Sequence, residues 1–70
     1  MNEGTLFAVV CYWEDKEINF NGYVKLFRQK VDALRYSRSC NVEYEDYIFN
    51  VEPISYEAAK AGKILDLLED

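Results

Sequence analysis

The chain has 70 residues, of which 50% are apolar and 16% aromatic, and its formal net charge is −5. A chain this short buries only about 60% of the surface that its unfolded form exposes, so we expect one small domain over residues 1–70. This composition argues against intrinsic disorder, and no apolar run approaches the roughly 20 residues that cross a bilayer. The first residues, MNEGTLFAVVCYWED, contain neither a basic segment nor a small-residue cleavage site, which predicts a cytoplasmic protein without a signal peptide.

Two strands are expected in the first third of the chain. Residues 5–13 are apolar or aromatic at almost every position, which is typical of a central strand buried on both faces. Residues 14–19 have the length of a hairpin connection, and residues 19–27 predict a second strand with a bulge at Gly22. The side chains of this second strand alternate, with Phe20, Val24 and Leu26 on one face and Tyr23, Lys25 and Phe27 on the other.

The apolar period then changes from two to about 3.6 residues. Residues 28–40 predict an amphipathic helix that Asn41 terminates. Its inward arc consists of Ala33, Leu34, Tyr36, Ser37 and Cys40, with Val31 at the edge. Its outward side carries Arg28, Asp32, Arg35 and Arg38.

A third strand is expected over residues 44–54. Tyr47, Phe49 and Val51 face one way, and Ile48, Asn50, Glu52 and Ile54 face the other. Pro53 cannot donate to a strand ladder, so this strand lies at a sheet edge or ends there.

The remaining residues favour one C-terminal helix with Ser55 as its N-cap. Its apolar face consists of Ala58, Ala61, Ile64, Leu65 and Leu68. The alternative is a short helix that ends before Gly62, because glycine costs roughly 1 kcal/mol inside a helix.

These elements predict an α+β fold in the order ββαβα. The simplest arrangement is a three-stranded antiparallel sheet in the order 2-1-3. The first helix covers one face of this sheet, and either the C-terminal helix or a second copy of the protein covers the other.

The sequence lacks the residues on which most catalytic and metal sites depend. It contains no His, which is the commonest general base and metal ligand, and its three glycines form no phosphate-binding loop. Cys11 and Cys40 are the only cysteines, and we expect both to be reduced and buried. Two thiols without His cannot complete a four-ligand zinc site. We therefore expect no enzyme activity, no metal and no cofactor.

Charge is distributed unevenly along the chain. Residues 25–38 carry five basic side chains and one acidic one, whereas residues 39–57 carry five acidic side chains and no basic one. The acids within residues 40–53 are open to four interpretations: a catalytic pair, a weak cation site, a solvated rim, or a docking surface for a basic partner. Catalytic and cation sites need a cleft with walls, which a three-stranded domain rarely forms.

Eleven aromatic residues are too many for one small core to hide. Tyr and Trp are favoured at interfaces because they bury large areas with few rotatable bonds. We predict a partner-binding surface, named here the acidic-aromatic patch: Trp13, Glu14, Asp15, Glu43, Tyr44, Glu45, Asp46 and Tyr47. Its acids would steer a basic protein partner and its rings would supply affinity. The first alternative is that the same surface joins two copies of the chain, as a homodimer or a structural assembly.

The second alternative is nucleic-acid binding through the basic helix face formed by Arg28, Arg35 and Arg38. A solvated helix face, or one paired with the acidic third strand, explains the same residues. The acidic net charge opposes binding to nucleic acid and to anionic membranes, so we expect neither as a partner.

The stretches FAVVCYWEDKE, KVDALRYSRSC and YEDYIFNVEPIS cover most of residues 6–55. In this order they resemble the small ββαβ-type proteins encoded by bacteriophages. The resemblance is architectural, and it implies a protein that binds and inhibits a host enzyme or defence complex, in some cases by presenting a DNA-like acidic surface. The basic helix over residues 28–40 departs from a fully acidic mimic of DNA.

Overall fold

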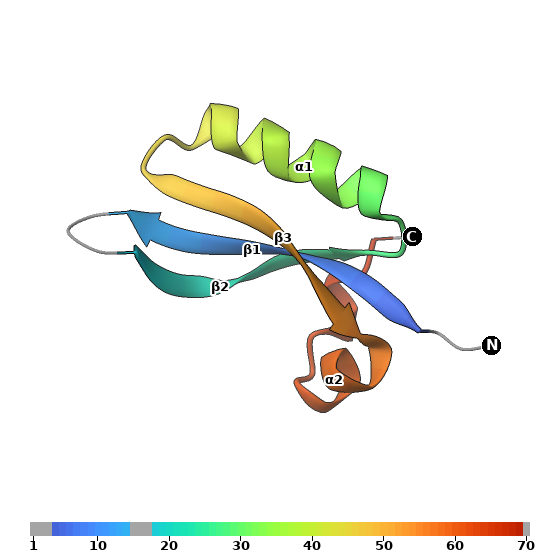
Figure 1. Cartoon of the computed structure of the whole chain (residues 1–70). Helices are drawn as coiled ribbons and strands as arrows, with labels where there is room; N and C mark the ends of the chain where they lie inside the picture. Colours follow the sequence, from blue (N-terminus) through green and yellow to red (C-terminus); the bar gives the residue numbers. More distant parts are fainter. Residues whose placement is uncertain (1–3, 15–17, 70) are drawn as a thin grey trace.

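The computed structural model describes residues 4–14 and 18–69, with side chains described for 4–13 and 22–69. The three strands are β1 (Thr5–Glu14), β2 (Ile18–Phe27) and β3 (Tyr47–Ser55). They form one antiparallel sheet in the order β2-β1-β3 (Figure 1). The predicted sheet and its strand order are confirmed.

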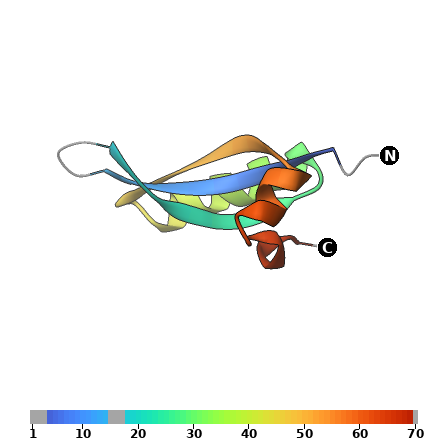
Figure 2. The same ribbon diagram turned by 90° about the horizontal axis from the view of Figure 1, so that it is seen from below.

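Helical segments lie on both faces of this sheet. The long helix α1 (Lys30–Glu43) connects β2 to β3 and lies along one face (Figure 1). The short helix α2 (Tyr56–Ala61) and the 3-10 turn η1 (Leu65–Leu67) pack on the opposite face, near one end of the sheet (Figure 2). The predicted α+β class is therefore also confirmed.

The central strand β1 is buried on both faces, as its continuous apolar sequence predicts. On the α1 side, Val9 and Cys11 belong to a cluster with Phe27, Phe49 and the inward residues of α1. On the opposite side, β1 and its neighbours form a second cluster: Leu6, Ala8, Val10, Leu26 and Ala59. The sheet therefore separates two small cores.

Two bulges change the alternation along β2. In its register with β1, Asn21 and Val24 are extra residues without a partner position. An extra residue shifts which face the following side chains occupy. Val24 consequently packs on the α1 side and Leu26 on the opposite side, which corrects the prediction that they share a face. Gly22 lies between the bulges with φ of 155°, a positive angle that favours glycine.

The helix α1 presents a narrow stripe of small side chains to the sheet. Ala33, Ser37 and Cys40 are buried, which lets the helix lie close against the strands. Leu34 is 45% exposed and Val31 57% exposed, so the predicted inward position of Leu34 is wrong. The helix α1 also begins two residues after the predicted start and continues past the predicted end at residue 40.

Asn41 ties the last turn of α1 to β3 instead of terminating the helix. Its Nδ2 donates to the carbonyl oxygen of Phe49 at 3.0 Å, and its Oδ1 accepts from the N–H of Phe49 at 2.9 Å. One amide side chain thus satisfies both backbone groups of a residue in an edge strand. This paired contact corrects the prediction that Asn41 ends the helix, and it explains why α1 reaches Glu43.

The start of α2 follows the sequence prediction, whereas its buried face does not. Ser55 is the N-cap, and its Oγ accepts a hydrogen bond from the N–H of Ala58 at 3.0 Å. The buried residue of α2 is Ala59, and the predicted Ala58 and Ala61 are exposed.

The C-terminal residues form separate short segments, so the prediction of one continuous helix is wrong. The chain turns after Gly62 because Lys63 has φ of 61°, a left-handed conformation that interrupts a helix. After η1, the N–H of Glu69 donates to the carbonyl oxygen of Leu26 at 2.8 Å. The Glu69 carboxylate pairs with Lys25 at 2.9 Å, which fixes this segment along the outer edge of β2.

We expect Asn41→Ala to lower the free energy of unfolding by about 1–3 kcal/mol, because it leaves the backbone groups of Phe49 without their partners. The control is Asn50→Ala, which truncates an exposed amide on the same strand. Urea unfolding followed by circular dichroism measures both variants, and equal midpoints for Asn41→Ala and the wild type would contradict the anchoring role.

Candidate partner-binding surface

A cluster of aromatic rings lies where α1 ends and β3 begins. The rings of Trp13 and Tyr47 are 5.3 Å apart, and those of Tyr47 and Phe49 are 6.4 Å apart. Tyr44, the C-cap of α1, lies 6.0 Å from Phe49. Phe49 is buried, whereas Trp13 is 46% and Tyr44 48% exposed. The cluster is therefore rooted in the core and presents rings at the surface.

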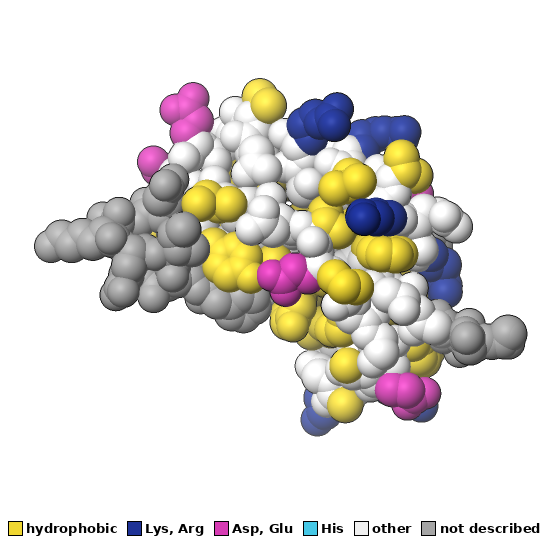
Figure 3. All heavy atoms as spheres, viewed as in Figure 1, with side chains coloured by type: hydrophobic (Ala, Val, Ile, Leu, Met, Phe, Trp, Pro, Cys, Tyr) yellow, Lys and Arg dark blue, Asp and Glu magenta, His cyan; other side chains and the backbone are white. Residues whose placement is uncertain are grey.

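Three carboxylates border this cluster. Glu43 is the last residue of α1, and Glu45 and Asp46 form the turn before β3; all three are exposed. Within the described part of the chain, these three carboxylates take part in no ion pair. Figure 3 shows acidic side chains at this end of α1 and basic side chains over its other half. The surface is therefore aromatic and anionic.

Most of the predicted acidic-aromatic patch is brought together by the fold. Its described members are Trp13, Glu43, Tyr44, Glu45, Asp46 and Tyr47. Asp15 and the side chain of Glu14 lie outside the described residues. Sequence reasoning did not include Phe49, the buried ring that supports Tyr44 and Tyr47. The alternation of side chains along β3 places Phe49 on the same face as Tyr47, and this pattern could have predicted that Phe49 supports the patch.

The other face of this end of the sheet also carries aromatic and aliphatic side chains. Tyr23 is 41% exposed, and Tyr12 and Ile48 are half-buried. The Tyr12 hydroxyl donates to Oε2 of Glu52 at 2.5 Å. We name these four residues the reverse surface.

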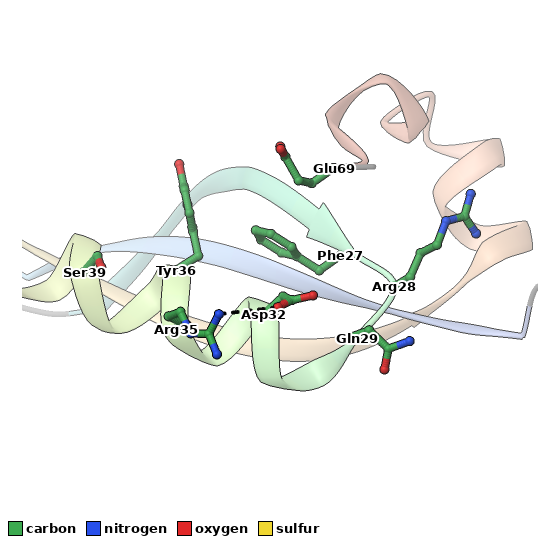
Figure 4. Close-up of a pocket in the computed structure, with 8 residues that line it drawn as sticks. All are labelled: Phe27, Arg28, Gln29, Asp32, Arg35, Tyr36, Ser39 and Glu69. Atoms are coloured by element: carbon green, nitrogen blue, oxygen red, sulfur yellow. Dashed lines mark ion pairs between the residues drawn. The ribbon is translucent and has the colours of Figure 1, made fainter.

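Two of the three arginines of the predicted basic face border a hollow of about 690 Å³ (Figure 4). The rings of Phe27 and Tyr36, 5.5 Å apart, lie beside it. Its charged lining consists of Arg28, Arg35, Asp32 and Glu69.

The acids in this hollow offset its arginines. Arg35 lies 3.9 Å from Asp32, and Glu69 pairs with Lys25. Arg38 does not line the hollow. The hollow therefore contains carboxylates beside two of the three arginines, which makes it less favourable for binding a phosphate backbone.

Both cysteines are free thiols and buried, as predicted. They line a second hollow, of about 280 Å³, with Val24, Tyr36, Tyr44, Tyr47 and Phe49. Burial raises the pKa of the Cys40 thiol, although a hydrogen bond with Tyr36 acts in the opposite direction. A protonated, buried thiol is a poor nucleophile, so this geometry does not favour cysteine chemistry.

No known protein family, curated protein or solved structure matches this chain. Among the residues that the structure describes, no helix has the length and apolar character needed to span a membrane. The same residues contain no group of three or more Cys, Asp or Glu side chains placed to hold a metal ion.

We expect Glu52→Gln to lower the pKa of Tyr12. That pKa is raised above its ordinary value chiefly because Glu52 accepts the phenolic hydrogen bond, and also through desolvation and the negative charge of Glu52. Ultraviolet titration of the phenolate, with Tyr12→Phe to assign the signal, measures the change, and Glu57→Gln is the control. An unchanged titration would contradict the pairing.

The same bond gives the fold a pH dependence. Because the folded-state pKa lies above the unfolded value, the bond stabilises the fold below the ordinary tyrosine pKa of about 10. The stabilisation is lost as the pH rises through the folded-state pKa. Glu52→Gln should therefore flatten the decline in stability over that range.

Proposed function

We propose that this protein is a non-catalytic binding module that occupies a surface of another protein through the acidic-aromatic patch. The observation that carries this proposal is the contact of Trp13 with Tyr47 at 5.3 Å, beside the exposed Tyr44. Both Tyr44 and Tyr47 pack against the buried Phe49. Rings held in place before binding lose little conformational freedom on contact, so they are effective anchors at an interface.

The charge around these rings supports a basic partner. Glu43, Glu45 and Asp46 are exposed and, among the described residues, form no ion pair that would have to be broken on binding. Acids at the rim of an interface steer a cationic surface toward it and raise the association rate. The partner is therefore a protein with Lys or Arg side chains around an apolar contact.

Covering a surface suffices for inhibition, because a bound module blocks whatever else would occupy that surface. The resemblance to small bacteriophage-encoded proteins supports a host enzyme or defence complex as the partner, and the host cytoplasm as the location.

Self-association is a second candidate, favoured by the separation of charge along α1, whose basic side chains precede the acids at its C-terminal end (Figure 3). The exposed Arg35 and Arg38 of one copy complement the acids of another. In this case, light scattering would report a mass that rises with protein concentration and falls with added salt, without a foreign partner.

We expect Tyr44→Ala to weaken partner binding by about tenfold or more, because truncation of an anchoring aromatic residue typically costs over 1 kcal/mol. The double variant Glu45→Lys, Asp46→Lys should slow association and reduce its salt dependence. The control Glu57→Lys introduces a Lys at an exposed site on α2.

The measurement is affinity capture from the cells in which the protein occurs, followed by binding kinetics with the purified captured protein. Capture by the wild type and the control, with loss in the patch variants, is the expected result. Equal capture by all of these proteins would contradict the proposed role of the patch.

A further inference from the structure

Near the acidic-aromatic patch, described side chains remain partly exposed on both faces of the sheet. On the side opposite α1, the described segments α2 and η1 pack near the other end of the sheet, as Figure 2 shows. Tyr12 of the reverse surface packs against the same core cluster as these segments, whereas Tyr23 remains 41% exposed. On the α1 side, the helix ends at Glu43, and Trp13 and Tyr44 remain exposed.

The two surfaces meet at adjacent rungs of the sheet. Trp13 pairs with Tyr47, and the adjacent Tyr12 pairs with Ile48. Successive residues of a strand point to opposite faces, so only the backbone layer separates the patch from the reverse surface. A partner that contacts the patch is therefore close to the reverse surface as well.

Both surfaces have the same charge character. Glu52 is the carboxylate of the reverse surface, and Tyr12 holds it in place. Among the described strand residues, the only basic side chain is Lys25, which pairs with Glu69 and lies near Tyr36 of α1. A second copy of this chain that docked through the same surfaces would bring one set of carboxylates toward another, whereas a cationic partner complements both surfaces.

The sheet edges are poorly suited to the alternative of strand addition. The backbone of Phe49 in β3 is already bonded to Asn41, and Pro53 has no N–H. On the other edge, β2 contains bulges at Asn21 and Val24. Bulges, proline and blocked backbone groups all disfavour pairing with another strand, so contact through the two faces remains.

We infer that the partner grips the sheet from both sides at the Trp13–Tyr47 and Tyr12–Ile48 pairs, as a folded protein whose cationic cleft has one wall on each face. One wall contacts Trp13 and Tyr44, and the other contacts Tyr23 and Ile48. Lys or Arg side chains of the walls pair with the patch acids and with Glu52. This inference rests on the proposed function, because it assigns a second contact to the partner of the same patch.

Site-specific photo-cross-linking tests the inference. The cross-linking residue p-benzoylphenylalanine replaces Tyr23 on the reverse surface, Tyr44 on the patch, or, as a control, the exposed Lys60 on α2. The expected result is that positions 23 and 44 cross-link to the same captured protein and position 60 does not. Cross-linking of position 23 to a second copy of this chain, or to a different protein, would overturn the inference.

Binding by truncated variants separates the two proposals. Tyr23→Ala should weaken binding of the captured protein by about tenfold, as truncation of an anchoring aromatic side chain does. The control Val42→Ala, which truncates an exposed side chain of α1, should leave binding unchanged. If Tyr44→Ala weakens binding and Tyr23→Ala does not, the proposed function stands and the two-sided grip falls. If neither variant weakens binding, both proposals fall. Circular dichroism of each variant confirms that it is folded before binding is compared.

Discussion

The burial of β1 on both faces is the constraint on which the rest of the structure depends. Its adjacent residues Val9 and Val10 point to opposite sides, and both are fully buried, so each face needs a cover. The covers are fixed by polar contacts as well as by packing. Asn41 joins α1 to β3 through the backbone of Phe49, and Glu69 joins the C-terminal segment to β2. A domain of this size buries little apolar surface, so these polar contacts help to hold the helical segments against both faces of the sheet.

The two covers do not extend over the whole sheet. The helix α1 stops at Glu43, and α2 lies against the opposite face near the other end (Figures 1 and 2). Strands that continue past their cover must leave some side chains at the surface. Here those side chains include Trp13 and Tyr23; Tyr44, at the C-cap of α1, is exposed beside Trp13 and Tyr47, with carboxylates nearby. The same geometry that forms the two cores therefore leaves aromatic and anionic side chains at the surface of this end of the sheet.

Patterns local in the sequence predicted the strand order, the central position of β1 and the Ser55 cap. Most of the arrangement of the patch was also predictable, because its members within residues 43–47 are close along the chain and the sheet order places Trp13 beside Tyr47 of β3. Contacts between distant residues escaped prediction. The role of Asn41 depends on its contact with Phe49, eight residues away in β3. The bulge at Val24 depends on how β2 pairs with β1. The turn at Lys63 depends on a positive φ angle that a lysine side chain does not predict.

The most direct test of the recognition surface uses Trp13, the only tryptophan of the chain. Labelling with 5-fluorotryptophan gives a single fluorine resonance at the centre of the acidic-aromatic patch. Addition of the captured partner should shift and broaden this resonance and protect it from a soluble paramagnetic relaxation agent. A resonance whose position, width and relaxation stay unchanged in a saturated complex would contradict recognition through this end of the sheet.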